Sequence, residues 1–186
     1  MSGLADLLNQ GAPAPGAYES WWGVSLKMDR QLLGFVVDTF FAQAATVADI
    51  EHIFFIMAIQ PITEGAMKGM QKNGGNALGL DPENGPYFVL NFNPAWNRAE
   101  NEVKFFKAVS IVIDLVKSEA KRRELDNSYI YMNYASEYQD PISSYGAANR
   151  QRLIKISKKY DPAQVFQYLQ PGGFKLAKGA PNLDAL

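Results

Sequence analysis

The chain has 186 residues, of which 47% are hydrophobic and 20% charged, a composition typical of a globular domain. Its formal net charge of −1 gives no electrostatic case for binding nucleic acid or an anionic membrane surface. The sequence has no cysteine, which excludes disulfides, thiolate metal sites, a cysteine nucleophile and a flavin attached through sulfur.

No segment of the sequence predicts a membrane span, a secretory signal or a metal site. The longest apolar run, from Ile53 to Ile59, is far too short to cross a bilayer. The N-terminus has no basic region and no long apolar stretch, so we expect a cytoplasmic protein. The single histidine, His52, lacks the His and Cys partners of a metal site and is interpreted as structural or exposed.

The predicted elements alternate along the chain as strand, helix, strand, strand, helix, strand and helix. A short helix at 2–9 and a turn-rich linker at 11–16 precede them. Asp29 is a good N-cap for the first long helix, and Pro61 is expected to end the second strand. The strands are predicted at 20–28, 50–60, 86–96 and 128–135, the helices at 29–45, 99–124 and 147–160, and a short helix or loop at 65–75.

This order of elements predicts an α+β fold, a two-layer sandwich in which helices pack on one face of a mostly antiparallel sheet. The length suits a single substrate-binding-type domain over residues 1–186. We expect an N-terminal segment at 1–19, the sheet and its helices at 20–146, and a C-terminal helix and tail at 147–186.

Several familiar catalytic patterns are missing from the sequence. It contains no G-x-G-x-x-G, no Walker loop and no G-x-S-x-G elbow. The acids Asp81, Glu83, Glu100 and Glu102 lie in a turn or at the start of a helix, where solvated charges and helix-dipole partners are common. We therefore do not predict that they form an acid/base pair.

The segment SYIYMNYA, residues 128–135, carries the main signal for a ligand site. If it is a strand, its alternation places Tyr129, Tyr131 and Asn133 on one face and Tyr134 on the other. Phenols and an amide provide flat apolar area together with groups that orient a ligand by hydrogen bonds. The alternative is that Tyr129 and Tyr131 pack beneath a helix with their hydroxyls in solvent.

Gln60 and Trp96 are further candidates because each lies at the end of a predicted strand. The Gln60 side chain has the length to reach into a cleft there, although the pattern alone favours a glutamine that caps a turn. Trp96 has a large ring with one donor, which suits a ligand wall, but tryptophans are more often core or interface residues.

Six segments occur in an order and at a spacing that resemble fungal FAD-linked oxidases of the berberine-bridge-enzyme-like type, in the vanillyl-alcohol-oxidase/PCMH-type flavoprotein superfamily. The resemblance covers about residues 20 to 176 and fits the C-terminal half of such an enzyme. The segments are IQPIT (59–63), GGNALGLD (74–81), the strand that ends in Trp96, YIYMNYAS (129–136), QDPISSYG (139–146) and YDPAQVFQYLQPGGFKL (160–176).

The resemblance implies roles for particular residues and for a cofactor. In this family the tyrosine and asparagine of the Y-x-N-Y segment approach the flavin ring or the substrate, which implies Tyr131, Asn133 and Tyr134 here. Gln60 would face the substrate. The family's FAD-binding domain precedes this region and is not in the sequence, so the resemblance implies that FAD is bound only if a partner domain supplies its site.

Three hypotheses of function follow. The chain is a half-flavoenzyme that works with a FAD-binding partner chain, or a cofactor-independent isomerase or cyclase that preorganises its substrate, or a non-catalytic binding module that homodimerises. In each case the ligand is a small hydrophobic compound resembling a fungal secondary metabolite. The candidate catalytic residues are Tyr131, Asn133 and Gln60, and the candidate substrate-binding residues are Tyr129, Tyr134 and Trp96.

Overall fold

The computed structural model describes residues 15–51 and 53–180. The helix predicted at 2–9 and the single histidine, His52, lie outside the described residues. Among the helices that are described, none has the length and apolar character needed to cross a membrane.

Five antiparallel strands form one sheet with β4 at its centre. β3 pairs with β4 along its whole length, β1 and β2 pair with successive parts of β4, and β5 pairs with β2. The α+β fold with a mostly antiparallel sheet is therefore confirmed. The strands are β1 (Tyr18–Glu19), β2 (Trp22–Lys27), β3 (Phe54–Ile62), β4 (Tyr87–Trp96) and β5 (Asp126–Asn127).

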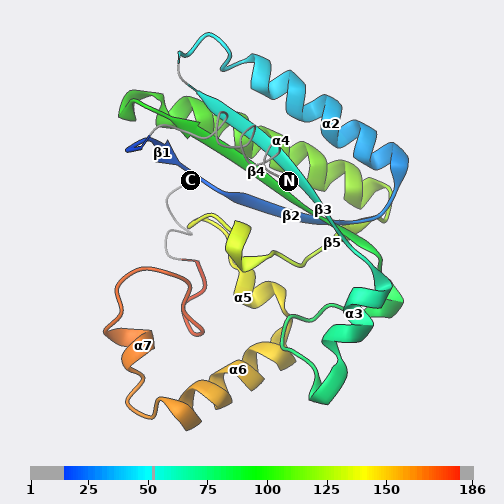
Figure 1. The fold of residues 1–186 in the computed structure, drawn as a ribbon, viewed down its shortest axis with the longest axis vertical. Helices are drawn as coiled ribbons and strands as arrows, with labels where there is room; N and C mark the ends of the chain where they lie inside the picture. Colours follow the sequence, from blue (N-terminus) through cyan, green and yellow to red (C-terminus); the bar gives the residue numbers. More distant parts are fainter. Residues whose placement is uncertain (1–14, 52, 181–186) are drawn as a thin grey trace, which may run out of the picture.

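Two long helices, α2 (Arg30–Ala45) and α4 (Glu102–Arg122), lie side by side against one face of this sheet (Figure 1). The predicted N-cap is confirmed, since the Asp29 carboxylate accepts a hydrogen bond of 2.7 Å from the Leu32 amide. Alternate residues of β2 and β4 point toward these helices, because side chains in a strand alternate between faces. The main core consists of Trp22, Val24, Leu26, Leu32, Val36, Phe40, Leu90, Phe92, Val109, Val112, Ile113, Val116 and Ala120.

The remaining helices lie away from this layer, with α6 and α7 at the opposite end of the molecule from α2 (Figure 1). Short 3₁₀ turns connect several elements, at Lys72–Gly74, Pro82–Asn84, Ala99–Asn101 and Met132–Tyr134. The smaller helices are α3 (Glu64–Met70), α5 (Pro141–Ser144), α6 (Ala147–Tyr160) and α7 (Val165–Tyr168).

The prediction that Pro61 ends its strand is wrong. β3 continues through Pro61, which pairs with Phe88, and ends at Ile62. Proline is tolerated there because β3 lies at the edge of the sheet, where a missing amide donor costs no ladder hydrogen bond.

The predicted strand at 128–135 is also wrong. Strand pairing stops after Asn127, whose side-chain oxygen accepts a hydrogen bond from the Tyr129 amide. The next amide, of Ile130, donates to the Ser144 hydroxyl instead of to a neighbouring strand, at 3.0 Å. The chain then closes a 3₁₀ turn in which the Tyr134 amide donates to the Tyr131 carbonyl. These local bonds satisfy the backbone without a ladder, so the predicted alternation of side chains does not apply.

Candidate functional site

A largely apolar groove of about 310 Å³ lies where β3 ends, on the face of the sheet opposite α2 and α4. Val89 contributes to its floor, and the neighbouring Leu90 points to the core on the other face. The helix α3 and the loop after it provide a wall. The lining residues are Gln60, Pro61, Ile62, Ala66, Met70, Leu78, Leu80, Val89, Tyr129 and Tyr131.

Four polar or aromatic side chains meet at the mouth of this groove. The Asn133 amide nitrogen donates a hydrogen bond of 2.8 Å to the Tyr131 hydroxyl. The Tyr134 hydroxyl donates to the Gln60 side-chain oxygen across 3.3 Å, which joins the 3₁₀ turn to β3. The rings of Tyr131 and Tyr134 meet edge to face with centroids 5.0 Å apart. Thus Tyr134, predicted on the opposite face from Tyr131 and Asn133, lies beside them because the segment is a turn.

The turn is held against the sheet through backbone groups. The Gln139 side chain accepts a hydrogen bond from the Gly23 amide at 2.9 Å and donates to the Gly23 carbonyl at 2.8 Å. Its oxygen also accepts from the Ser136 amide. A Cβ atom at residue 23 would lie 3.1 Å from the Tyr134 carbonyl oxygen, so glycine allows the close approach.

Sequence reasoning missed Gln139 and Gly23, and no local pattern marks them. Beyond the end of β5, the Gln139 side chain makes the hydrogen bonds to the Gly23 backbone that a neighbouring strand would otherwise make. Gly23 is 116 residues away in the sequence. Neither residue indicates this contact by itself in the sequence, because the two meet only when the whole chain folds.

Tyr129 lines the groove but is buried, and its ring stacks on Tyr145 with centroids 5.8 Å apart. Burial, and then the neighbouring phenols of Tyr145 and Tyr131, raise the pKa of the Tyr129 hydroxyl well above its ordinary value. The Tyr145 phenol also has a raised pKa, chiefly through burial. Both phenols are therefore neutral at physiological pH, where they can act as hydrogen-bond donors but not as bases.

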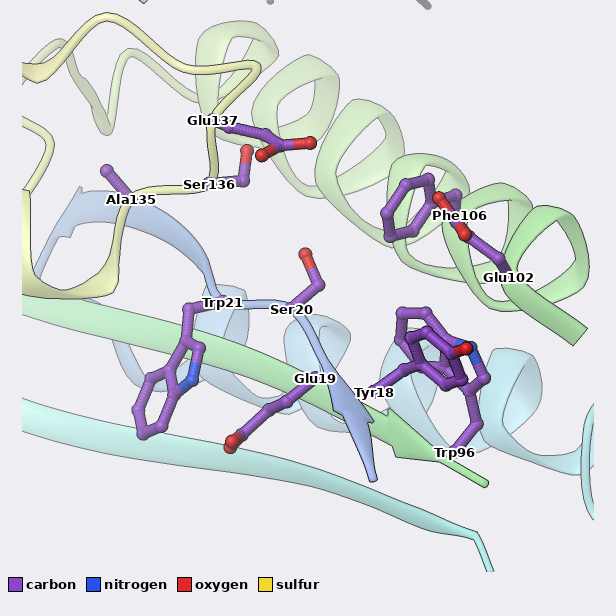
Figure 2. Close-up of a pocket in the computed structure, with 10 residues that line it drawn as sticks. All are labelled: Tyr18, Glu19, Ser20, Trp21, Trp96, Glu102, Phe106, Ala135, Ser136 and Glu137. Carbon is purple, nitrogen blue, oxygen red and sulfur yellow. The ribbon is translucent and has the colours of Figure 1, made fainter. Parts of the chain in front are cut away.

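The structure does not bring Trp96 together with the other candidates. Gln60 pairs with Val89, and Trp96 is seven positions further along β4, a distance of about 23 Å along a strand. Trp96 is 2% exposed and stacks between Tyr18 and Phe105. It lines a different pocket, which is drawn in Figure 2.

The groove can bind and orient a small apolar molecule with one or two polar groups. Its volume is at the lower end of the range of about 300 to 1,000 Å³ for small-molecule sites. Within the described part of the chain, no group of His, Cys, Asp or Glu is arranged to hold a metal ion. No lysine or arginine lines the groove, so it does not fit the diphosphate of FAD, although it fits a substrate or the edge of an aromatic ring.

Comparison with known proteins gives a class for the chain. The family described as "Berberine and berberine like" matches residues 130–171, a range that contains the Tyr131–Tyr134 turn and the helices α5, α6 and α7. The match therefore includes the part of the candidate site that the sequence resemblance singled out.

Several similar proteins are fungal FAD-dependent monooxygenases. The FAD-dependent monooxygenase FUP4 of Fusarium proliferatum is 33% identical over 181 residues, which cover 95% of this chain and 35% of that protein. The FAD-dependent monooxygenase drtC of Aspergillus calidoustus is 39% identical over 66% of the chain and 23% of its own length. The bifunctional solanapyrone synthase of Alternaria solani is 35% identical over 63% of the chain and 22% of its length. No solved structure gives a significant match.

These comparisons confirm the predicted resemblance: the chain is a relative of the berberine-bridge-like FAD-linked oxidases. It spans about a third of the length of the relatives that match it over nearly its whole sequence.

Proposed function

We propose that this chain provides the substrate-facing part of a berberine-bridge-like FAD-linked oxidoreductase, and that a FAD-binding partner chain completes the enzyme. Its substrate is a small hydrophobic natural product of fungal secondary metabolism. The observation that carries this proposal is the convergence of Gln60, Tyr131, Asn133 and Tyr134 on an apolar groove, in a chain related to FAD-dependent monooxygenases.

The side chains at the groove are suited to binding and orientation. The apolar wall buries the body of a hydrophobic substrate, while the Tyr131 hydroxyl and the Gln60 amide hold a polar group at the mouth. The Asn133 amide donates to the Tyr131 oxygen, which leaves the phenol proton of Tyr131 free for a carbonyl or hydroxyl of the substrate. Tyr131 is thus a donor that Asn133 orients.

A second feature supports a partner that covers the tail. Large apolar side chains are exposed on the second half of α6, on α7 and just beyond it, and exposed apolar surface of this kind marks interaction sites. Tyr160, Tyr168 and Leu169 are each about three-quarters exposed. The exposed set is Ile156, Tyr160, Val165, Phe166, Tyr168 and Leu169.

FAD supplies the redox chemistry of this family when it is bound, and the protein positions the reactants around it. The groove has no lysine or arginine for the cofactor's diphosphate, and the proposal therefore assigns FAD to a partner chain. A cofactor-independent isomerase or cyclase remains the competing hypothesis, because the same groove would also restrict a flexible substrate to one conformer. The bifunctional solanapyrone synthase among the relatives is a reason to test that hypothesis as well.

The deciding experiment isolates the tagged full chain from the organism that produces it and records absorbance between about 350 and 500 nm, where oxidised flavins absorb. We expect a stable complex with a second protein and a flavin band. The purified chain alone, incubated with FAD and desalted, should remain colourless. A complex without flavin, or a chain that retains FAD by itself, would contradict the assignment to a partner.

Variants of the site test the residue roles separately from the complex. Tyr131→Phe and Asn133→Ala should still form the complex with flavin but should lower turnover of the substrate by about 10- to 100-fold, since one oriented hydrogen bond to a reacting group contributes on this order. Asn97→Ala removes an exposed amide just beyond the end of β4 that lies away from the groove, and serves as the matched control. If both site variants match wild type, the groove is not the substrate site.

A further inference from the structure

The groove lies on the face of the sheet opposite α2 and α4, and Trp21 points to the same face further along β4. β1 and β2 pair with β4 in one continuous register, which places Trp21 opposite Asn93. The adjacent Trp22 belongs to the core beneath the two helices, so Trp21 points to the other face of the sheet. Figure 2 shows the Trp21 ring directed away from the pocket drawn there and across the strands.

Three aromatic rings follow one another from the groove to Trp21. Tyr131 lines the groove and meets Tyr134 edge to face, with centroids 5.0 Å apart. Tyr134 in turn stacks on Trp21, with centroids 5.8 Å apart and planes inclined by 19°. The hydrogen bond from the Tyr134 hydroxyl to Gln60 holds the middle ring across to β3. The aromatic surface is therefore continuous from the groove to Trp21.

Trp21 is exposed, unlike the other two tryptophans. It is 38% exposed, whereas Trp22 and Trp96 are 4% and 2% exposed. Across β4 from Trp21, the uncharged β3 residues Ile56 and Ala58 are only partly buried. The exposed part of the Trp21 ring and these two side chains thus provide apolar surface beside the groove, and the proposed function makes no use of it.

The position of Trp21 sets a length and a shape for a molecule that would contact both it and the groove. Val89 lines the groove, and Asn93, opposite Trp21, is four positions further along β4, a distance of about 13 Å along a strand. A compound that reaches both places is elongated. A planar unit suits the row of rings because aromatic surfaces attract other π systems in stacked and edge-to-face contacts.

We propose that Trp21 extends the substrate site and selects substrates with an elongated planar part, either aromatic or conjugated. This inference rests on the proposed function of the groove. The polar group of the substrate lies with Tyr131 and Gln60 at the mouth, and the planar part lies along Tyr134 and against the exposed surface of Trp21. A short substrate does not reach Trp21, and one that cannot become flat loses the ring contacts.

Three phenols test this proposal by equilibrium dialysis with the full chain. trans-4-Hydroxystilbene is long and planar, 4-(2-phenylethyl)phenol is its flexible analogue, and 4-ethylphenol is long enough only for the groove. The stilbene should bind most tightly, but its rigidity alone also favours binding, so the comparison between variants is decisive. In proton–nitrogen correlation spectra, the stilbene should shift the indole N–H signal that is lost in Trp21→Phe, and 4-ethylphenol should not.

Variants of Trp21 separate contact with the ligand from support of the neighbouring ring. Trp21→Leu should weaken stilbene binding about three- to tenfold, the range for one aromatic pair, and leave 4-ethylphenol binding unchanged. Trp21→Phe should retain most of the stilbene affinity. Phe41→Leu, which replaces an exposed aromatic residue on α2, is the matched control and should affect neither compound. An equal loss for the long and the short phenol shows that Trp21 only supports Tyr134, and overturns the proposal.

Tyr131→Phe distinguishes an error in this inference from an error in the groove itself. It should weaken binding of all three phenols about two- to tenfold through the loss of one hydrogen bond. If all three respond to Tyr131→Phe and none to Trp21→Leu, the extension is wrong and the groove stands. If none of the three binds, the groove and its extension are both wrong.

Discussion

Replacing Gln139 by alanine should destabilise the fold strongly for a single polar substitution. The Gln139 side chain makes hydrogen bonds to the Gly23 amide, the Gly23 carbonyl and the Ser136 amide. Gly23 is buried, and Gln139 itself is 7% exposed. Water therefore has little access to the backbone groups that the truncation would leave without partners.

The magnitude follows from those unpaired groups. Each buried donor or acceptor left unsatisfied costs about 1–3 kcal/mol, and water that enters the space left by the side chain recovers part of that cost. For the two groups of Gly23 we expect Gln139→Ala to lower the free energy of unfolding by about 2–4 kcal/mol. This is a large share of the roughly 5–15 kcal/mol that stabilises a typical domain.

Urea unfolding monitored by tryptophan fluorescence measures this change, with Gln151→Ala on the exposed side of α6 as the control. The control should change stability by less than about 0.5 kcal/mol. If Gln139→Ala unfolds at the same urea concentration as the control, the hydrogen bonds to Gly23 do not hold the turn, and the reasoning about the site's support fails.

Two further predictions concern other parts of the molecule. Hydrogen bonds from Arg122 and then from Arg123 lower the pKa of the Glu119 carboxyl from 4.5 to about 2. The contribution of this ionised carboxylate to the stability of the fold is therefore present above pH 4.5 and is lost as pH falls toward 2. Acid unfolding followed by circular dichroism should therefore be less steep for Glu119→Gln over that interval, and an unchanged acid transition would contradict the contact. At Gly79, with φ of +74°, an added Cβ would lie 2.5 Å from the Tyr145 carbonyl oxygen. Gly79→Ala should destabilise by about 2–4 kcal/mol in urea, whereas Gly74→Ala, also at positive φ but with open space, should cost only about 1–2 kcal/mol; equal losses would refute the steric argument.

The sheet and its two long helices were predictable because their signals are local. β2 and β4 alternate or run continuously in apolar residues, and α4 combines a helical stripe of apolar residues with acids early and bases late. Asp29 marks the start of α2 by a hydrogen bond within its own first turn. Each of these signals depends on residues that are close together in the sequence, so the sequence alone indicates the element.

The candidate site was only partly predictable because its geometry depends on distant contacts. The structure brings Tyr131, Asn133, Tyr134 and Gln60 together at one groove, whereas the sequence pattern had assigned residues 128–135 to a strand with Tyr134 on the opposite face. Tyrosine, isoleucine and methionine suit a strand as well as a packed turn. The choice between them is made by long-range hydrogen bonds, above all those from Gln139 to Gly23 of β2. The roles of the four residues in binding or catalysis stay predictions.

The manner in which the turn is attached to the sheet has a consequence for how such proteins diversify. The contacts that fix the turn join Gln139 to the main chain, and the Tyr134 carbonyl rests over a glycine that has no side chain. Replacing the side chains at 131, 133 or 134 leaves those attachments intact. If these three side chains face the substrate, as we propose, selection for a new substrate can act on them while the fold is inherited unchanged, provided that the glycine and the glutamine are kept.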